Sequence, residues 1–458
     1  MIKKYVGDRE FYKRLIAVLI PVLIQNIITN FVSLLDNVMV GRVGTEQMSG
    51  VAIVNQLIFV FALCIFGGLA GAGIFTAQYF GSRDSKGVRD TFRFKWYIAI
   101  GSCAIFTAVF VLFGDKLIMS FLHEGEEELD LAATFAYAKD YLRVMMLQIP
   151  IFAAIQVYAS TLRETGETRL PMIASVMSVL VNLCFNYILI FGKLGAPKLG
   201  VTGAAIATVL ARCVECFIVV SWAHRHKAKN EFIVGAYSSF AIPKALTKQI
   251  AVTGTPLLIN ELLWAAGMAM LNQSYSLRGL EVVSAVNIAS TVSNLFICAA
   301  LAMGTAVSII IGQILGAGDI ERAVDEDRKL IAFSVVLCTA IGIVMLFVAP
   351  IVPRIYNTSE NVKSIAGNLL IVSAVMMPAT AYTNTCYFTL RSGGKTLITF
   401  LFDSAFVWAV SVPAAFLLTR LTALPILEVF IIVQALELIK CIVGFILVRS
   451  KKWANHLV

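Results

Sequence analysis

The chain has 458 residues, of which 59% are hydrophobic and 14% are charged, and its mean hydropathy is +0.84. Soluble domains carry charge on about a quarter of their residues. This composition therefore excludes a water-soluble protein and indicates an all-α membrane protein. We assign the formal net charge of +9 to loops at one membrane face rather than to nucleic-acid binding. The nine cysteines show no metal-binding spacing, and no cofactor is expected.

Twelve apolar stretches are long enough to cross roughly 30 Å of hydrocarbon as helices. The first half of the chain contains six of them, at Leu15–Val40, Val51–Phe80, Phe94–Phe113, Tyr137–Leu162, Leu170–Phe191 and Val201–Ala223. The second half contains the other six, at Leu246–Asn272, Ser284–Leu315, Leu330–Ala349, Ser364–Leu390, Thr396–Leu418 and Leu427–Val448. Because Leu15 continues into a full span, we expect no cleaved signal peptide.

The two halves repeat each other. Residues 21–93 align without a gap on residues 256–328 at a shift of 235, and a second register at a shift of 228 aligns residues near 161 with residues near 389. The matched pairs include Pro21 and Pro256, Gln78 and Gln313, Gly81 and Gly316, Asp84 and Asp319, Thr161 and Thr389, and Gly166 and Gly394. Such a duplication predicts two six-helix lobes related by a pseudo-two-fold axis along the membrane normal, as in many transporters.

Lysine and arginine positions predict the orientation in the membrane. If the N-terminus is cytoplasmic, most of the 37 Lys and Arg residues lie on the cytoplasmic side. We therefore expect a multi-pass protein of the bacterial plasma (inner) membrane with both termini in the cytoplasm. The expected lobes are residues 1–230 and 231–458, joined by a polar cytoplasmic linker around residues 224–245. The protein is expected to be a monomer.

The first half contains one candidate ion site. Asn26, Asn30, Ser33 and Asn37 form a polar stripe along the first helix, with Asp36 beside it. Asn182 and Asn186 share a face of the fifth helix at spacing i, i+4 and reach a similar depth at 1.5 Å per residue. A carboxylate with two amide oxygens could bind Na⁺ or hold a proton. The alternative is a carboxylate near the interface, with asparagines that only join helices.

The second half offers a different set of polar residues. Asn260 and Glu261 follow Pro256 on the seventh helix, with Trp264 one turn further. Glu261 is a candidate for cyclic protonation, or else a permanently neutral acid in the core. Asp403, on the eleventh helix, has no oppositely charged residue nearby on its own helix. The pairs Arg212 with Glu215 and Glu437 with Lys440 are expected to be structural. All four histidines lie in loops or the tail, so a proton relay would use carboxylates.

Three segments resemble a known family. LLDNVMVGRVG at the end of the first helix, TLRETGETRLP between helices four and five, and NLCFNYILIFGKLGAPKLGVTGAAIAT through helices five and six are similar to multidrug and toxic compound extrusion (MATE) transporters. These belong to the multidrug/oligosaccharidyl-lipid/polysaccharide flippase superfamily. With the duplicated halves, the resemblance covers essentially the whole chain. It implies two lobes in a V around a central cavity, and export of cationic, often aromatic, compounds driven by Na⁺ or H⁺ entry.

The resemblance also implies roles for particular residues. Asp36 matches the family's cation-coupling aspartate, Asn182 and Asn186 match its polar pair, and Pro21 matches the proline at which the first helix bends in some members. Two departures stand out. Asn186 replaces an aspartate of the DinF-like branch, and the tenth helix offers Asn384 with two threonines but no acid.

We therefore expect a secondary active efflux transporter that exchanges Na⁺ or H⁺ for organic cations by alternating access. Asp36, Asn182, Asn186 and Glu261 are the expected coupling residues, and the first three could bind Na⁺. Pro21 and Pro256 are expected hinges. The expected substrate cavity draws on Asn26, Asn30, Asn260, Trp264, Asn384 and Asp403.

Other functions are alternatives to this one. Residue types alone do not exclude a channel or receptor, although the duplication argues against both. A lipid-linked precursor or polysaccharide flippase should line its cavity with several basic residues, whereas Arg212 is the one arginine expected at mid-membrane depth. An exporter of one specific metabolite would share every feature named so far. A membrane enzyme would need clustered His, Asp or Ser residues at membrane depth, which the sequence does not display, so no enzymatic activity is expected.

Overall fold

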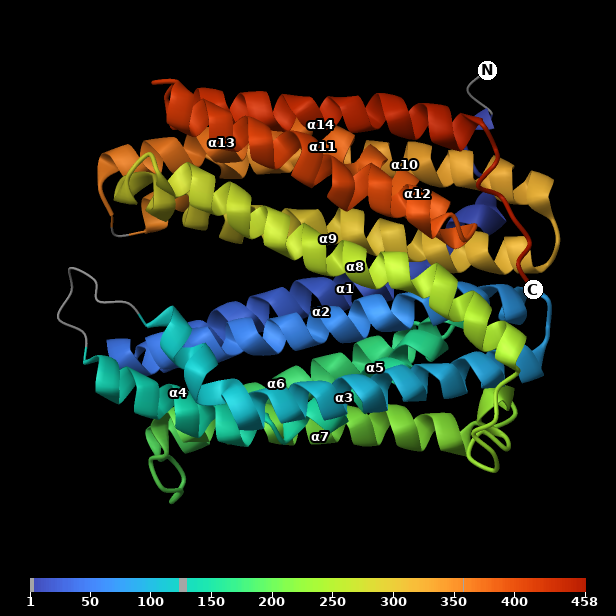
Figure 1. Ribbon diagram of the computed structural model, residues 1–458, viewed down its shortest axis with the longest axis horizontal. Helices are drawn as coiled ribbons and strands as arrows, with labels where there is room; N and C mark the ends of the chain where they lie inside the picture. Colours follow the sequence, from blue (N-terminus) through green and yellow to red (C-terminus); the bar gives the residue numbers. More distant parts are fainter. Residues whose placement is uncertain (1–3, 123–129, 357) are drawn as a thin grey trace. The chain divides into compact units, whose positions relative to one another are not determined.

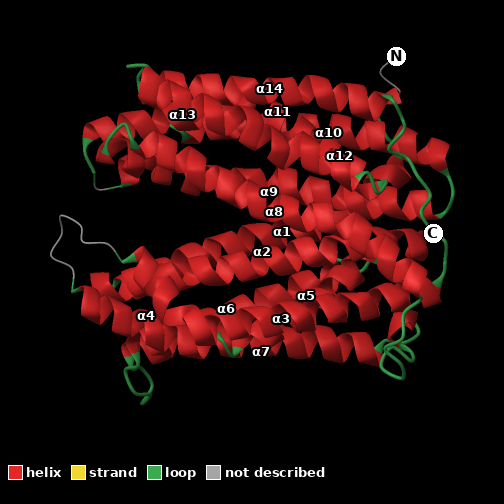
Figure 2. Cartoon of the chain, viewed as in Figure 1, coloured by secondary structure: helices red, strands yellow, loops and turns green. Residues whose placement is uncertain are grey.

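The computed structural model describes residues 4–122, 130–356 and 358–458, with the side chains of residues 32–35, 37 and 38 excepted. The regular elements in this part of the chain are helices (Figures 1 and 2). In chain order they are α1 (Arg9–Gly41), α2 (Thr45–Gly81), α3 (Ser85–Phe121), α4 (Leu131–Met145), α5 (Gln148–Glu164), α6 (Arg169–Phe191), α7 (Gly200–Arg225), η2 (Glu231–Ile233), α8 (Lys244–Ser276), α9 (Leu280–Gly316), α10 (Ile320–Val348), η3 (Val352–Ile355), α11 (Glu360–Ser392), α12 (Thr396–Phe400), η4 (Leu401–Ala405), η5 (Val407–Ser411), α13 (Val412–Leu421) and α14 (Ile426–Arg449).

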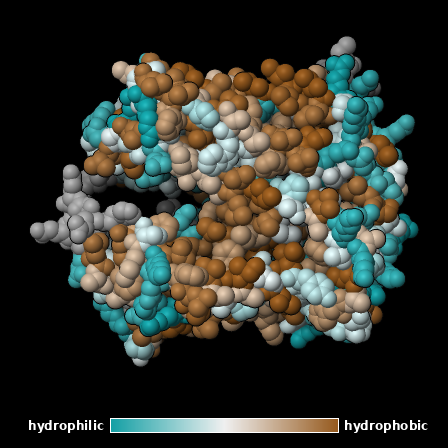
Figure 3. Space-filling model, viewed as in Figure 1, coloured by the Kyte–Doolittle hydropathy of each residue, from teal (hydrophilic) through white to brown (hydrophobic). Residues whose placement is uncertain are grey.

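The described residues contain eleven spans that are long and apolar enough to cross a membrane, and the bent pair α4 and α5 makes a twelfth. On the face drawn in Figure 3, apolar residues cover the middle of the helices and hydrophilic residues gather toward the helix ends. The chain is therefore a multi-pass membrane protein, and the predicted all-α class with twelve spans is confirmed.

Two of the expected spans are not single regular helices. The fourth, Tyr137–Leu162, is bent by 47° between α4 and α5, a few residues before Pro150. Proline lacks an N–H and its ring clashes with the carbonyl four residues earlier, which favours a break at this point without requiring one, since α11 continues through Pro378. The eleventh, Thr396–Leu418, passes from α12 through two π-helical segments, η4 and η5, into α13. Such segments often lie at functional sites, and Asp403 lies in the first of them.

The internal repeat is visible in backbone geometry. The turn after α2 and the turn after α9 each have a left-handed residue at the same repeat position, Arg83 with φ 60° and Gly318 with φ 80°. Both turns have the same hydrogen bond across them, from Asp84 N to Tyr79 O and from Asp319 N to Ile314 O. The second register behaves likewise, because Gly166 and Gly394 both have positive φ angles. The duplication read from the sequence is thus a structural repeat.

The chain forms two compact units. Unit 1 contains the described residues up to Leu23, with Ala77–Asp84 and Ile250–Val458; unit 2 contains Ile24–Thr76 and Ser85–Gln249. Helices α1 and α2 therefore contribute residues to both units. The lobe boundary expected at residue 230 stays a prediction.

The first half of α1 is part of the core of unit 1. Leu15 and Leu19 are at most 3% exposed and belong to the same buried cluster as residues of α9, α10 and α11. Arg14 forms an ion pair with Glu326 of α10, which also accepts a hydrogen bond from Arg322. The passage of α1 from unit 1 to unit 2, at Leu23, comes two residues after Pro21.

Unit 2 packs α6 along α7 and α3 against α5. The buried Lys95 of α3 forms an ion pair with Glu164 of α5. The segment between α7 and α8 lies against α3, where Arg93 donates hydrogen bonds to the carbonyl oxygens of Gly235 and Ala236 at 2.7 and 2.9 Å. This connection is therefore packed onto unit 2. Burial raises the pKa of the Tyr237 hydroxyl within it.

Candidate functional site

Asp36 of α1 lies beside the two asparagines of α6. The Asn186 Nδ2 donates a hydrogen bond to Asp36 Oδ1 at 2.6 Å and another to Asn182 Oδ1 at 3.0 Å. Asn182 and Asn186 are 5% and 2% exposed. The three residues expected to meet at a coupling site are therefore in contact within unit 2, with the Asn186 amide between the other two. Which end of this amide is N and which is O follows from the hydrogen bonds it makes.

The hydrogen-bond chain continues into α7. Asn182 Nδ2 donates to Thr208 Oγ1 at 3.3 Å, and Thr208 donates in turn to the Ala204 carbonyl. One atom in this series of hydrogen bonds lacks a partner. The buried Asn186 Oδ1 has no hydrogen-bond donor among the described residues. Buried oxygens without a partner are uncommon in folded proteins. This oxygen is the acceptor that a cation or an acidic proton at the site would satisfy.

Two further side chains define the electrostatics around Asp36. Within the described part of the chain, no Lys or Arg comes within ion-pairing distance of its carboxylate. Arg212 of α7 acts on it from further away, while its own guanidinium is bound to Glu215 at 2.6 Å. Tyr141 of α4 is 4% exposed and also interacts electrostatically with Asp36. The expected Arg212–Glu215 pair is present.

A second polar cluster is formed by α8, α11 and η4 in unit 1. Asn260 is 2% exposed and donates hydrogen bonds to Tyr387 Oη at 3.3 Å and Asp403 Oδ2 at 3.2 Å. Its own Oδ1 and carbonyl oxygen accept from the backbone N–H and hydroxyl of Ser404. Asn260 thus has partners at both ends of its amide, unlike Asn186.

Glu261 lies beside this cluster. The Tyr387 hydroxyl donates to Glu261 Oε1 at 3.4 Å, and the charges of Asp403 and Arg391 act on the same carboxylate. Three candidates from the sequence, Asn260, Glu261 and Asp403, are therefore connected through one tyrosine or through direct bonds.

Asp403 has a cationic partner that its own helix does not supply. Lys440 of α14 lies 3.1 Å from Asp403 Oδ1 and 3.2 Å from Glu437 Oε2, with its side chain 9% exposed. The expected Glu437–Lys440 pair is present, and Asp403 joins it to form a triad of two carboxylates on one ammonium. The reason is that η4 packs on α14 and brings Asp403 to the lysine.

The remaining candidates that the structure describes lie outside the two polar clusters. Asn26 is half-buried, and Asn30 Nδ2 donates to the Asn26 carbonyl within α1. Trp264 is 39% exposed and Asn384 is half-buried. Ser33 and Asn37 lie outside the side chains that the structure describes. Pro21 and Pro256 both lie inside continuous helices, α1 and α8.

Sequence reasoning missed one residue within each cluster that joins it to a neighbouring helix. Tyr387 and Thr208 join the acids and amides to neighbouring helices, yet neither stands out in a membrane chain rich in Tyr and Thr. Lys440 had a signal, because a lysine at membrane depth needs a counter-charge. The described residues contain no group of three or more His, Cys, Asp and Glu side chains able to hold a metal ion.

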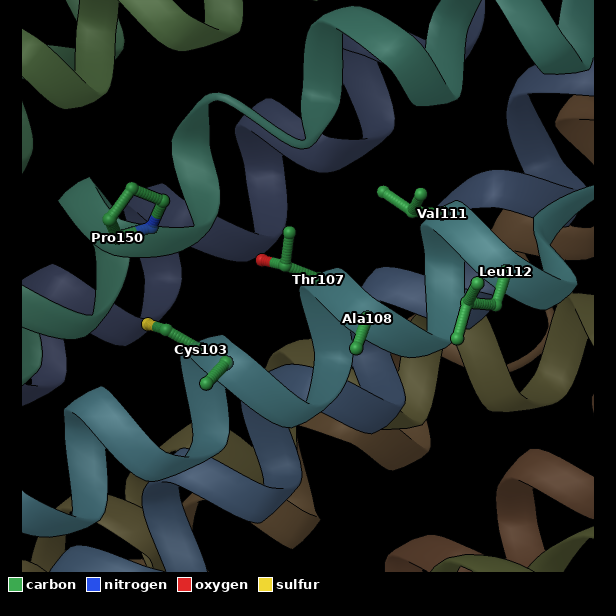
Figure 4. Close-up of a pocket in the computed structure, with 7 residues that line it drawn as sticks. Cys103, Thr107, Ala108, Val111, Leu112 and Pro150 are labelled. Atoms are coloured by element: carbon green, nitrogen blue, oxygen red, sulfur yellow. The ribbon is translucent and has the colours of Figure 1, made fainter.

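Figure 4 shows a groove on α3, lined by residues between Cys103 and Leu112 and bordered by Pro150 of α5. Its lining contains no charged side chain. The groove therefore lacks the group that would bind a cationic solute, and it is separate from both polar clusters.

A model of the MatE family matches residues 21–188 and 256–417, one match in each half of the chain. Among curated proteins, the chain is 26% identical to the probable multidrug resistance protein NorM of Thermotoga maritima, over 98% of this chain and 94% of that protein. It is 23% identical to the probable multidrug resistance protein YoeA of Bacillus subtilis, over 90% and 88% of the two chains.

Solved structures agree on the fold. The chain superposes with a TM-score of 0.87 on an outward-facing multidrug resistance MATE family transporter of the MOP superfamily, at 21% identity and over 98% of this chain and 97% of the other. It also resembles a point variant of the Vibrio cholerae MATE transporter VcmN, with a TM-score of 0.85 at 18% identity and over 97% of this chain and 98% of the other.

Proposed function

This chain belongs to the MatE family, and we propose that it is a secondary active efflux transporter in which Na⁺ or H⁺ entry drives export of small organic cations by alternating access. Relatives of similar length are named multidrug resistance proteins, which supports small organic compounds as substrates. The observation that carries the proposal is the contact of Asp36 with Asn186, together with the partnerless Oδ1 of Asn186 in the described structure.

The Asn186 amide can serve both states of Asp36. In the state described, its Nδ2 donates to the carboxylate. When Asp36 takes a proton, the new O–H needs an acceptor, and half a turn of the amide presents Oδ1 to it. When Na⁺ binds instead, the same rotation adds an amide oxygen to those of Asp36 and Asn182, and hard cations prefer oxygen ligands. In either case the free acceptor is used only when the cation is present.

Charge explains why occupancy at Asp36 matters. A carboxylate inside a membrane protein without an ion-pair partner is costly, and it marks an ion pathway. Neutralising it removes that cost and frees the outer part of α1 from its charge-assisted bond to α6. Because residues 9–23 of α1 pack in unit 1 and residues 24–41 in unit 2, the ion decides how firmly this helix is attached to unit 2.

The second cluster supplies the counter-charge for a cationic substrate. Glu261 accepts from Tyr387. The charge of Arg391 acts on it, but unlike Asp403 it has no ion pair with a lysine in the described structure. Its carboxylate is therefore the acid of this cluster that is available to a cation. Asp403 and Lys440 satisfy each other, and their role is to hold η4 against α14.

Purified protein in liposomes loaded with a fluorescent organic cation tests the proposal. We expect efflux when an inward Na⁺ or H⁺ gradient is imposed, and the gradient that works identifies the coupling ion. Asp36→Asn should reduce this efflux to the level of protein-free liposomes. Asp115→Asn, which changes an exposed acid of α3 paired with Lys139, should transport like the wild type. Unchanged gradient-driven efflux by Asp36→Asn would refute Asp36 as the coupling group.

A further inference from the structure

The C-terminal segment Ser450–Val458 is docked within unit 1 on the ends of α2, α9 and α11. Trp453 is 1% exposed and lies in the buried cluster that contains Phe11 of α1 and Leu15. Its indole N–H donates to the Val448 carbonyl at 3.1 Å. A Cβ atom on Gly393 would clash with the Trp453 carbonyl oxygen, so the segment and the turn after α11 touch through their backbones.

Gln78, near the end of α2, binds this segment with its whole amide. It is fully buried, its Nε2 donates to Ser392 O at 3.1 Å and Asn455 O at 3.2 Å, and its Oε1 accepts from Leu457 N at 2.8 Å. One side chain therefore recognises two backbone positions of the C-terminal segment and one of α11. Since a buried amide is costly without partners, Gln78 ties the end of α2 to a docked segment.

Two other side chains of the C-terminal segment contact the ends of α9 and α11. Asn455 Nδ2 donates to the Gly393 carbonyl at 3.1 Å, and His456 Nε2 lies 3.2 Å from the Gly316 carbonyl. The docked segment thus contacts the ends of α2, α9 and α11 at once.

The ends of α2 and α9 also cross closely beneath it. A Cβ on Gly81 would clash with Gln313 O, and a Cβ on Gly316 would clash with Gln78 O. The two contacts exchange repeat-equivalent residues, as a two-fold axis between repeats requires. Only glycine permits this approach, so the crossing is a specific contact that the C-terminal segment covers.

We propose that residues 450–458 form a strap that fastens the end of α2 to α9 and α11, and that the strap leaves Gln78 when the protein opens on that side. The physical reason is that residues 77–84 belong to unit 1 whereas the rest of α2 belongs to unit 2. A movement of one unit against the other would therefore act on α2 next to the residue that binds the strap. The transport step rests on the proposed function; the docking itself does not.

Hydrogen–deuterium exchange tests the docking. In Gln78→Leu, which keeps the size of the side chain and removes its three hydrogen bonds, amides of residues 77–84 and 313–318 should exchange about tenfold faster or more. A chain ending at Ser450 should show the same change. Lys452→Ala, an exposed residue of the same segment, should exchange like the wild type. Unchanged protection in Gln78→Leu overturns the strap, whether or not the shortened chain accumulates.

Transport kinetics separate a strap from a merely structural contact. If release of the strap favours the state open to the cytoplasm, Gln78→Leu should lower the KM for substrate offered on that side severalfold, with Vmax unchanged or reduced. A purely structural role would lower the amount of folded protein and leave KM unaltered, which would refute the transport role. If the wild type shows no gradient-driven efflux, the proposed function fails, while the exchange result still decides whether the segment is docked.

Discussion

At the scale of single residues, the amide at position 186 has a property that a carboxylate would lack. It presents a donor to a charged Asp36 and holds an acceptor in reserve for a neutral or cation-bound one. An aspartate at this position would place two like charges within hydrogen-bond distance, which disfavours ionising both. The asparagine therefore leaves Asp36 as the single titrating group of this cluster.

Substitutions along the asparagine chain should have graded effects. Asn186→Ala removes both ends of the amide that touches Asp36, so the ion concentration for half-maximal efflux should rise about tenfold, in keeping with about 1–3 kcal/mol for a lost partner of a buried polar group. Asn182→Ala, which reaches Asp36 only through Asn186, should cause a smaller rise. Titration of Na⁺ and of pH in the liposome assay measures both, and equal effects would contradict the order of contacts.

Lys440 should matter for stability rather than for coupling. Lys440→Met leaves Asp403 and Glu437 without their shared cation, and breaking a buried pair costs about 3–5 kcal/mol. Because both carboxylates keep some exposure, we expect the lower end of that range, seen as a lower thermal unfolding temperature in detergent. Adding Asp403→Asn and Glu437→Gln should restore most of the loss. A single variant as stable as the wild type would show that the triad is dispensable.

At the scale of elements, α1 is one of the two helices, with α2, that contribute residues to both units. Its first half is fixed to α9 and α10 by Leu15, Leu19 and the Arg14–Glu326 pair. Its second half is fixed to α6 through Asp36. Pro21 lies just before the point where the packing partner changes, and a proline inside a helix removes one backbone hydrogen bond. Flexibility is therefore located where the helix passes from one unit to the other.

Pro21→Ala should slow transport without weakening substrate binding. The restored hydrogen bond stiffens α1 at the change of unit, so Vmax should fall severalfold while KM and the unfolding temperature are maintained or raised. Efflux rates at varied substrate concentration measure the split. Pro197→Ala, in the exposed loop after α6, is the matched control. A Pro21→Ala variant with normal Vmax would mean that α1 does not bend at this position during transport.

At the scale of the whole molecule, the repeat and the charge distribution predict a fixed orientation. Phe11, near the start of the chain, and Trp453, near its end, belong to the same buried cluster of unit 1, so the two termini lie at the same end of that unit. The basic residues of the loops favour the cytoplasm for that end.

Epitope tags test this orientation. Tags at the N-terminus and at the C-terminus should both be protected from added protease in intact cells and cleaved after the membrane is opened. A tag placed between α7 and α8 should behave in the same way. Cleavage of any of the three tags in intact cells would contradict the predicted orientation. It would indicate that the C-terminal segment faces the outside.

Much of the fold could be predicted from local sequence. Composition indicated the lipid bilayer, and the spacing of residues along the chain indicated the twelve spans and the repeat. The fixed rise per residue of a helix converts this spacing into length and depth in the membrane. Asp36, Asn182 and Asn186 could be brought together for the same reason, since depth along a helix is a count of residues. The bend between α4 and α5 could not, because Pro150 and its repeat partner Pro378 look alike in sequence, yet α11 continues through Pro378.

The sequence by itself determined that this is a membrane protein of two repeated halves, and it identified the acid and the two amides of a candidate ion site. Only the tertiary structure decided which side chains far apart in the chain become neighbours. Lys440 meets Asp403 because η4 packs on α14, and Gln78 meets Asn455 and Leu457 because the chain returns to the end of α2. Helix periodicity specifies the face and depth of a residue, whereas the identity of the facing helix depends on the packing of the whole chain.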